Sequence, residues 1–126
     1  MKLEIPYKKA KEIADKIISV LKTHCIRIDI AGSIRRRNDV CGDVEIVCQP
    51  KETVLKDMFG WDEGVIRSME FITSVEKLGE IVKGCQNDGK YCQIKLPEGI
   101  NLDLFIPTEK DYFRQLAIRT GSADYS

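Results

Sequence analysis

The sequence has few of the features that mark metal-thiolate, secreted or membrane proteins. It contains one histidine and five cysteines, and no Cys-x-x-Cys pair is present, so a zinc site is not expected. No apolar run approaches the roughly 20 residues of a membrane span, and the N-terminus lacks the apolar core of a signal peptide. We therefore expect a cytoplasmic protein with reduced thiols and no membrane partner.

The chain has no net charge at neutral pH. Twenty basic side chains balance twenty acidic ones, which argues against a protein that binds nucleic acid by long-range electrostatics alone. Any polymeric substrate is expected to be held weakly. The basic residues still cluster in the segments 8–11 and 35–37, where either a local positive patch or a solvated surface is expected.

The apolar content is sufficient for one core. A hydrophobic fraction of 43% over 126 residues, without low-complexity stretches, predicts a single folded domain over residues 1–126. Apolar residues at three- and four-residue spacing predict a helix that begins near Pro6 and ends at Leu21, and a second helix is expected over 68–77. A third is expected over 111–118, after Thr108 as its cap.

Alternating and β-branched segments predict the sheet. The fold class is therefore α+β, with a mixed or antiparallel sheet of about five strands and helices packed on one face. The expected strands cover 26–31, 44–48, 81–85, 91–96 and 100–106. The segment 51–64 has no clear period and is expected to be a loop or insertion. The tripeptide Thr120-Gly121-Ser122 is typical of a turn into a further element.

A phosphate-binding turn is the first candidate site. The strand over 26–31 ends at Gly32-Ser33, and Ser33 is expected to cap a short helical turn through the three arginines that follow. Glycine lets an oxyanion approach the backbone, and a hydroxyl and a guanidinium add hydrogen-bond donors. The alternative is an ordinary turn, because these residue types also satisfy common turn preferences.

Three acidic residues form the second candidate site. Asp43 and Glu45 are two residues apart on one strand and so project from the same face. Asp103 lies between Leu102 and Leu104, so it faces away from the core and can join that pair. Carboxylates that gather in this way need a cation, and oxygen ligands suit Mg²⁺. The alternative is a set of exposed polar positions on an amphipathic sheet.

The order of these features resembles a known family. The runs Ala31-Gly32-Ser33-Ile34-Arg35-Arg36 and Gly42-Asp43-Val44-Glu45 resemble the palm domain of family X DNA polymerases and, more loosely, other polymerase-β-like nucleotidyltransferases. The resemblance continues through Leu102-Asp103-Leu104-Phe105-Ile106-Pro107 to Arg119-Thr120-Gly121-Ser122, which is similar to the entry into the family's thumb. It covers the chain from about Tyr7 to its end.

The resemblance implies a two-metal transferase. Asp43 and Glu45 would ligate two Mg²⁺ ions, with Mn²⁺ as an alternative, and Asp103 would ligate the catalytic ion and accept the proton of the attacking hydroxyl. Ser33, Arg36 and the backbone of Gly32 and Gly42 would hold the phosphates of a nucleoside triphosphate. Gly121 would lie near the sugar.

Two departures from the family pattern are present. Glu45 stands where the best-known members carry aspartate, and the Gly-Asp-x-Glu pattern resembles phage-borne relatives, which suggests a phage or prophage origin. A lyase-type domain, a helix-hairpin-helix segment and a thumb are not recognisable, so the chain is expected to stop where a thumb-like element begins. An additional domain or protein partner is expected to supply that surface.

The expected function is transfer of a nucleoside monophosphate to a hydroxyl, with a weakly held DNA 3′ end as the favoured acceptor. The alternatives are a minimal nucleotidyltransferase that modifies RNA, protein or a small molecule, and a noncatalytic module that binds a nucleotide or a partner.

Overall fold

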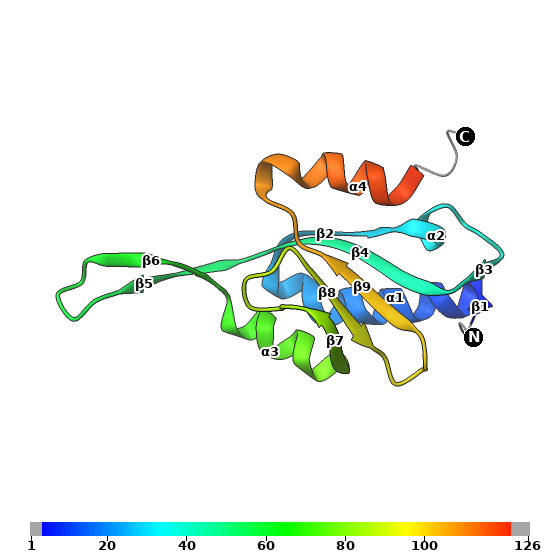
Figure 1. Cartoon of the computed structure of the whole chain (residues 1–126), viewed down its shortest axis with the longest axis horizontal. Helices are drawn as coiled ribbons and strands as arrows, with labels where there is room; N and C mark the ends of the chain where they lie inside the picture. Colours follow the sequence, from blue (N-terminus) through cyan, green and yellow to red (C-terminus); the bar gives the residue numbers. More distant parts are fainter. Residues whose placement is uncertain (1–3, 122–126) are drawn as a thin grey trace.

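The computed structural model describes residues 4–121 and has the expected α+β class (Figure 1). Within this range a mixed five-stranded sheet has the order β2-β4-β9-β8-β7. Strands β4 and β9 run parallel, and the other neighbours are antiparallel. The strand bounds are β2 Cys25–Ala31, β4 Asp43–Pro50, β7 Glu80–Gly84, β8 Tyr91–Lys95 and β9 Asn101–Phe105. All five expected strands of the sheet are therefore confirmed.

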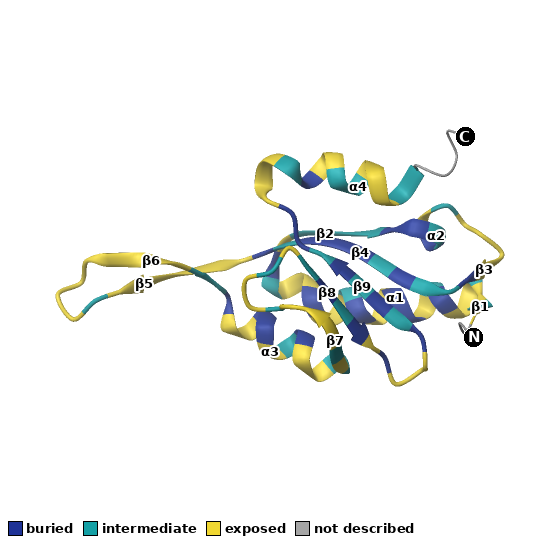
Figure 2. Ribbon diagram, in the orientation of Figure 1, coloured by how far each residue is buried: buried dark blue, intermediate teal, exposed yellow. Residues whose placement is uncertain are grey.

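Helices α1 (Tyr7–Leu21) and α3 (Met69–Leu78) cover one face of the sheet (Figures 1 and 2). Two of the three expected helices are thus confirmed, with Pro6 directly before α1, and α4 (Tyr112–Gly121) confirms the third. Ser68 caps α3, since its hydroxyl accepts a hydrogen bond from the Phe71 amide over 3.4 Å. The main core forms between these helices and the sheet from buried apolar side chains of alternate strand positions: Val44, Ile46 and Cys48 of β4, Cys92 and Ile94 of β8, and Leu102 and Leu104 of β9.

Helix α4 (Tyr112–Gly121) follows the short 3₁₀ turn η2 (Glu109–Asp111) and lies on the opposite face (Figure 1). Tyr112 is fully buried there in a second cluster with Ala31 and Val47. Its hydroxyl donates to Asp29 Oδ2 over 2.7 Å and also lies 3.0 Å from the Val47 carbonyl oxygen. Burial and the bond to Asp29 raise the pKa of Tyr112, so this buried polar group is neutral and satisfied.

A projecting β-hairpin replaces the loop expected over 51–64. Strands β5 (Glu52–Lys56) and β6 (Asp62–Arg67) pair antiparallel, and we call the hairpin that they form the arm. Figure 1 shows the arm projecting from the body. Every residue of β5 is exposed. Neither face of the arm packs on the core, so the apolar and polar alternation that reveals a half-buried strand does not arise.

Two expectations about turns are wrong. Helix α2 (Gly32–Arg35) begins before Ser33, and its N-cap is Ala31 without a side-chain hydrogen bond. Gly32 has a φ of +64°, which turns the chain into the helix directly after β2. At the other end, α4 continues through Thr120 and Gly121, so the predicted turn does not begin there. Ser122 lies outside the described residues, as does the expected start of a thumb-like element.

Three short elements complete the described part of the chain: β1 (Ile5–Pro6), which pairs with β3 (Val40–Cys41), and the 3₁₀ turn η1 (Lys22–His24). Thr108 precedes η2 as expected, but its side chain makes no capping hydrogen bond. The five cysteines are free thiols, and Cys85 alone among them is exposed. Across residues 4–121, none of the helices has the length and apolar character needed to cross a bilayer.

Candidate functional site

The three predicted acids lie on the sheet face that α1 and α3 do not cover. Glu45 on β4 and Asp103 on β9 are direct partners in the parallel ladder. Asp43 lies two residues before Glu45 and therefore on the same face. Because β4 and β9 are adjacent in the sheet, Glu45 and Asp103 are neighbours although they are far apart in the sequence. The expected shared face is thus confirmed at the level of the backbone register.

Asp103 is held by two donors from the adjacent strand β8. The Tyr91 hydroxyl donates to Asp103 Oδ1 over 2.6 Å, and Gln93 Nε2 donates to the same oxygen over 3.0 Å. Gln93 is the direct ladder partner of Asp103. Burial, followed by the hydrogen bond to Asp103, raises the pKa of Tyr91, so its hydroxyl keeps the proton that it donates. These two bonds fix the orientation of the Asp103 carboxylate.

Glu45 is the electrostatically strained member of the group. Burial raises its pKa most, and the neighbouring carboxylates of Asp103 and Asp43 raise it further. The guanidinium groups of Arg36 and Arg119 act in the opposite direction. Because the pKa is raised on balance, the two arginines do not fully compensate for burial and the adjacent negative charge. An added cation would stabilise this carboxylate.

Gly32 lies directly against Glu45. A Cβ atom added at Gly32 would collide with the carboxylate group of Glu45. Ala31, the residue before Gly32, is the ladder partner of Glu45 on β2, which explains the close approach. The glycine is therefore required twice, once by its φ of +64° and once by the space that the Glu45 side chain occupies.

The other residues predicted to hold phosphate lie at one end of the same face. Ser33 is in α2, and Gly42 directly precedes β4. Arg36 follows α2, and its Nη1 donates to the Thr120 carbonyl oxygen near the end of α4 over 2.8 Å. This bond brings α2 next to Gly121, the last residue of α4. The structure therefore places Arg36, one of the predicted phosphate residues, near Gly121, the predicted sugar residue.

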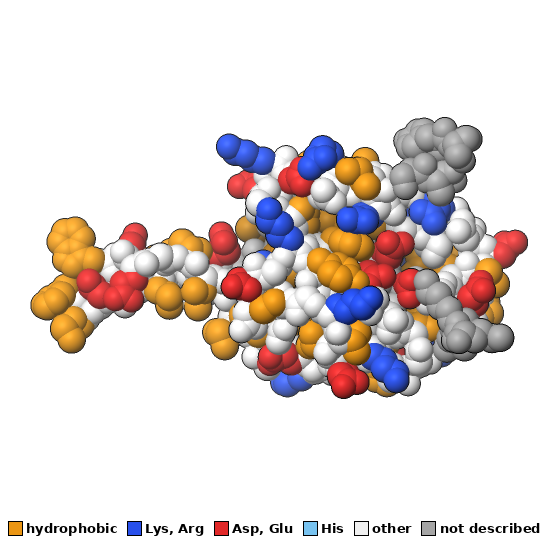
Figure 3. Space-filling view, in the orientation of Figure 1, with side chains coloured by type: hydrophobic (Ala, Val, Ile, Leu, Met, Phe, Trp, Pro, Cys, Tyr) orange, Lys and Arg blue, Asp and Glu red, His pale blue; other side chains and the backbone are white. Residues whose placement is uncertain are grey.

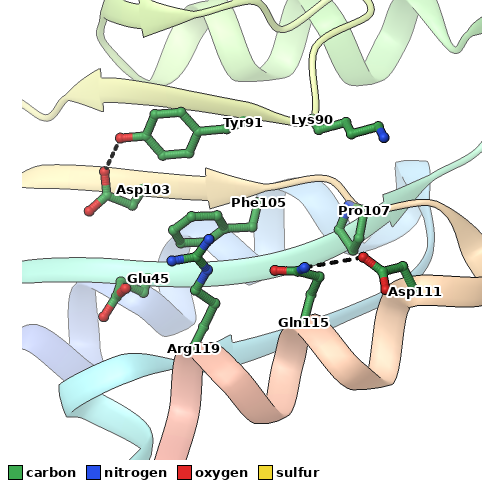
Figure 4. A pocket seen from close by; sticks show the side chains of 9 residues that line it. All are labelled: Glu45, Lys90, Tyr91, Asp103, Phe105, Pro107, Asp111, Gln115 and Arg119. Carbon is green, nitrogen blue, oxygen red and sulfur yellow. Dashed lines mark hydrogen bonds between the residues drawn. The ribbon is translucent and has the colours of Figure 1, made fainter. Parts of the chain in front are cut away.

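A cleft of about 590 Å³ lies between the sheet and α4, within the usual size range of small-molecule sites (Figure 4). Glu45 and Asp103 line it, whereas Asp43 and the residues predicted to hold phosphate do not. Arg119, on α4, stacks over the Phe105 ring, and its guanidinium carbon lies 4.3 Å from the ring centre. The full lining is Glu45, Lys90, Tyr91, Asp103, Phe105, Pro107, Asp111, Gln115 and Arg119.

Several of these residues were not identified from the sequence. Tyr91 and Gln93 alternate with the buried residues Cys92 and Ile94, a pattern that indicates a polar face of β8. That signal was sufficient to place them on the site face. Their pairing with Asp103 depends on the β8–β9 register, for which the sequence has no comparable signal. Lys90 lines the cleft from the residue directly before β8, whereas Gln115 lines it only because α4 lies over the sheet.

The three carboxylates are the kind of ligand that a hard divalent cation such as Mg²⁺ prefers. Asp43, Glu45 and Asp103 offer only carboxylate oxygens, and burial, together with the neighbouring carboxylates, raises the pKa of Glu45 and so disfavours its charged form without a cation. Within residues 4–121, however, no three His, Cys, Asp or Glu side chains are gathered closely enough to hold an ion in their present conformations. Ligation of one ion by all three carboxylates thus requires side-chain rotation, with the backbone register already in place.

Comparison of the sequence with models of protein families and with curated proteins found no match.

Proposed function

We propose that the chain is the catalytic palm of a nucleotidyltransferase, similar to those of family X DNA polymerases. It would transfer a nucleoside monophosphate from a (deoxy)nucleoside triphosphate to a hydroxyl, with a weakly held DNA 3′ end as the favoured acceptor. The observation that carries the proposal is the ladder pairing of Glu45 with Asp103, with Asp43 on the same face and the Gly32 turn against Glu45. The free thiols support a reducing, cytoplasmic setting.

Each site residue has a role in the proposal. Asp43 and Glu45 would hold two Mg²⁺ ions, or Mn²⁺ in their place, and Asp103 would join them at the catalytic ion. Bound Mg²⁺ supplies positive charge to the phosphate oxygens and lowers the pKa of the attacking hydroxyl. The ladder pairing of Glu45 with Asp103 and the two donors on Asp103 support this use, because they hold the two strands and one carboxylate in place before a ligand arrives.

The substrate would lie with its phosphates toward α2. Ser33, Arg36 and the amides of Gly32 and Gly42 would donate to the phosphate oxygens, and Gly121 would face the sugar. The acceptor oxygen forms a bond to the α-phosphorus, while the bond from the α-phosphorus to the bridging oxygen breaks and pyrophosphate leaves with those electrons. Asp103 would accept the proton of the hydroxyl, since its carboxylate faces the cleft.

A second acceptor class is favoured by the charge of the cleft. Three acidic side chains, Glu45, Asp103 and Asp111, and two basic ones, Lys90 and Arg119, line it, and the whole chain has no net charge. A long polyanion gains little attraction from such a surface. RNA ends, protein hydroxyls and small molecules are therefore the alternative acceptors.

The test is a transfer assay with the full chain, labelled triphosphates, Mg²⁺ and a gapped DNA duplex. The proposal predicts growth of the primer strand, and Asp43→Asn and Asp103→Asn should each abolish it. Asp88 is exposed in the turn between β7 and β8, so Asp88→Asn is the matched control and should keep full activity. Full activity in the Asp43 and Asp103 variants would show that the ligand assignment is wrong. Label transfer to RNA or a small hydroxyl, without primer growth, would select the alternative acceptors.

A further inference from the structure

The tip of the arm exposes three large apolar side chains. Met58, Phe59 and Trp61 are 89%, 78% and 73% exposed. Figure 3 shows them as an apolar cluster at the end of the arm, remote from the body of the molecule. Burial of apolar surface is the main favourable term in protein association, and a concentrated apolar patch of this kind is typical of an interaction site.

Internal hydrogen bonds order the tip. Asp57 Oδ1 accepts from the amides of Phe59 and Trp61 over 2.8 and 2.9 Å, and the Gly60 amide donates to the Asp57 carbonyl oxygen over 3.0 Å. Lys56 Nζ bonds to Asp62 Oδ1 at 2.8 Å at the base of the turn. The aromatic side chains are therefore presented from a defined backbone, which lowers the entropy lost on binding.

The charge of the tip selects the kind of partner. The tip residues 57–63 contain Asp57, Asp62 and Glu63 and no basic residue, and Lys56, which pairs with Asp62 at the base of the turn, leaves the tip with a net negative charge. Nucleic acid and anionic lipid would be repelled, although aromatic residues alone would suit stacking on bases. The tip therefore suits a protein surface with an apolar floor and a basic rim.

A groove with these properties lies on the α1 and α3 side of the same protein. Its volume is about 540 Å³, and it runs between the two helices and the turn that joins β8 to β9. The apolar floor includes Ile13, Ile17, Leu78 and Leu96, and the basic rim consists of Lys16 and Lys77. One acid, Glu98, also reaches the rim, so the rim has a positive excess.

We propose that the arm tip of one copy binds in the α1–α3 groove of a second copy, and that two copies exchange arms to form a dimer. Figure 1 shows the tip projecting away from α1 and α3 of its own chain, so the tip can reach this groove only on another copy. Each aromatic side chain buries roughly 150–250 Å². Phe59 and Trp61 together therefore bury roughly 300–500 Å² of a tip, and the groove buries a similar area. Because the dimer has two such contacts, it buries roughly 1,200–2,000 Å² in total, the size of a stable interface.

Sedimentation velocity of the full chain, across a wide concentration range, tests the proposal. The wild type should dimerise, and Phe59→Ser with Trp61→Ser should raise the dimer dissociation constant by roughly 100-fold or more, as expected for two aromatic hot spots. Ile26→Ser, which removes an apolar side chain 57% exposed on β2, is the matched control and should leave dimerisation unchanged. Circular dichroism confirms that each variant is folded.

A mixing experiment identifies the two halves of the contact. A groove variant, Lys16→Glu with Lys77→Glu, should be monomeric by itself, as should the tip variant. A mixture of the two should associate, because the intact tip of one meets the intact groove of the other. Dimerisation of the groove variant by itself would indicate contact between two tips and would overturn the proposal, as would a mixture that shows no association even at high concentration. A folded wild type that stays monomeric at every concentration would overturn it too, and would assign the tip to a different protein partner.

Discussion

Tyr91 and Asp103 are joined across β8 and β9 by a hydrogen bond of 2.6 Å, in which the tyrosine hydroxyl donates to Asp103 Oδ1. Gln93 donates to the same oxygen, so both bonds from β8 end on one side of the carboxylate. The second oxygen, Oδ2, lies outside this pair of bonds. An acid arranged in this way is oriented by the sheet and still presents an oxygen to a ligand.

Tyr91→Phe tests the orienting role of this bond. Loss of the hydroxyl should lower the free energy of unfolding by about 1 kcal/mol, the usual net contribution of one hydrogen bond. It should also weaken Mg²⁺ binding by roughly tenfold, as expected when a group that orients a ligand is removed. Denaturant unfolding and calorimetric titration measure the two effects.

Tyr112→Phe is the matched control, because it removes a hydroxyl that bonds to Asp29 and Val47 on the same face, outside the cleft lining. It should lower stability by a similar amount and leave Mg²⁺ affinity unchanged. Equal losses of affinity in both variants would mean that Tyr91 acts only on stability.

Gly32→Ala tests the contact between Gly32 and Glu45. The alanine would have to adopt a φ of +64° and displace the Glu45 carboxylate. We expect a loss of about 1–2 kcal/mol from the backbone conformation, plus a further loss from the collision. Gly60→Ala isolates the backbone contribution, since Gly60 has a φ of +82° and open space around the added Cβ.

Thermal unfolding of the two alanine variants therefore separates conformation from collision. Adding Glu45→Ala to Gly32→Ala should recover part of the excess loss, because it removes the carboxylate from that space. Equal losses at Gly32 and Gly60, with no recovery in the double variant, would contradict the proposed contact.

Glu45→Gln tests the electrostatic strain of the site without metal. Burial and the carboxylates of Asp103 and Asp43 raise the pKa of Glu45. An acid whose folded-state pKa is raised binds its proton more tightly in the folded state. Its charged form therefore lowers stability at neutral pH, and stability recovers as the pH falls through the raised pKa.

The glutamine variant should accordingly be more stable than the wild type at neutral pH, by at most about 1 kcal/mol after allowance for solvent screening. The difference should disappear well below the ordinary glutamate pKa. Glu80→Gln, at an exposed position on the edge strand β7, is the control and should leave stability at neutral pH nearly unchanged. Destabilisation by Glu45→Gln at neutral pH would show that Glu45 is well compensated by Arg36 and Arg119.

Arg36→Ala tests the connection between α2 and α4. The Arg36 guanidinium donates to the Thr120 carbonyl oxygen over 2.8 Å, so its removal should loosen the last turn of α4. Hydrogen exchange of the amides in that turn should accelerate, while the first turn near Tyr112 stays protected. Arg35→Ala removes an exposed neighbour that bonds to Ile30 instead, and should leave the exchange of α4 unchanged.

The parts of the fold that were predictable from the sequence are those with a buried face. The apolar spacing from Ala10 to Leu21 and the alternation in β8 and β9 arise because one side of each element packs on the core. The arm was not predicted because neither of its faces is buried. Its strands therefore show no periodic signal, and only tertiary structure distinguishes them from a loop.

The candidate site was predictable in its residue types and face, but not in its geometry. Strand parity, with the apolar neighbours of each acid assigned to the core, places Asp43, Glu45 and Asp103 on one face. The direct pairing of Glu45 with Asp103 depends on β9 lying parallel beside β4, which is a property of strand order. The bond from Tyr91, the collision space at Gly32 and the cleft under α4 likewise depend on contacts between elements that are distant in sequence.

The most direct test of the central claim is a calorimetric titration of the full chain with Mg²⁺ and a nonhydrolysable nucleoside triphosphate. The proposal predicts nucleotide binding that requires Mg²⁺, that is lost in Asp43→Asn and Asp103→Asn, and that is retained in Asp88→Asn. Absence of Mg²⁺-dependent binding by the folded wild type, or unchanged binding in the Asp43 and Asp103 variants, would contradict the claim that these carboxylates form a metal and nucleotide site.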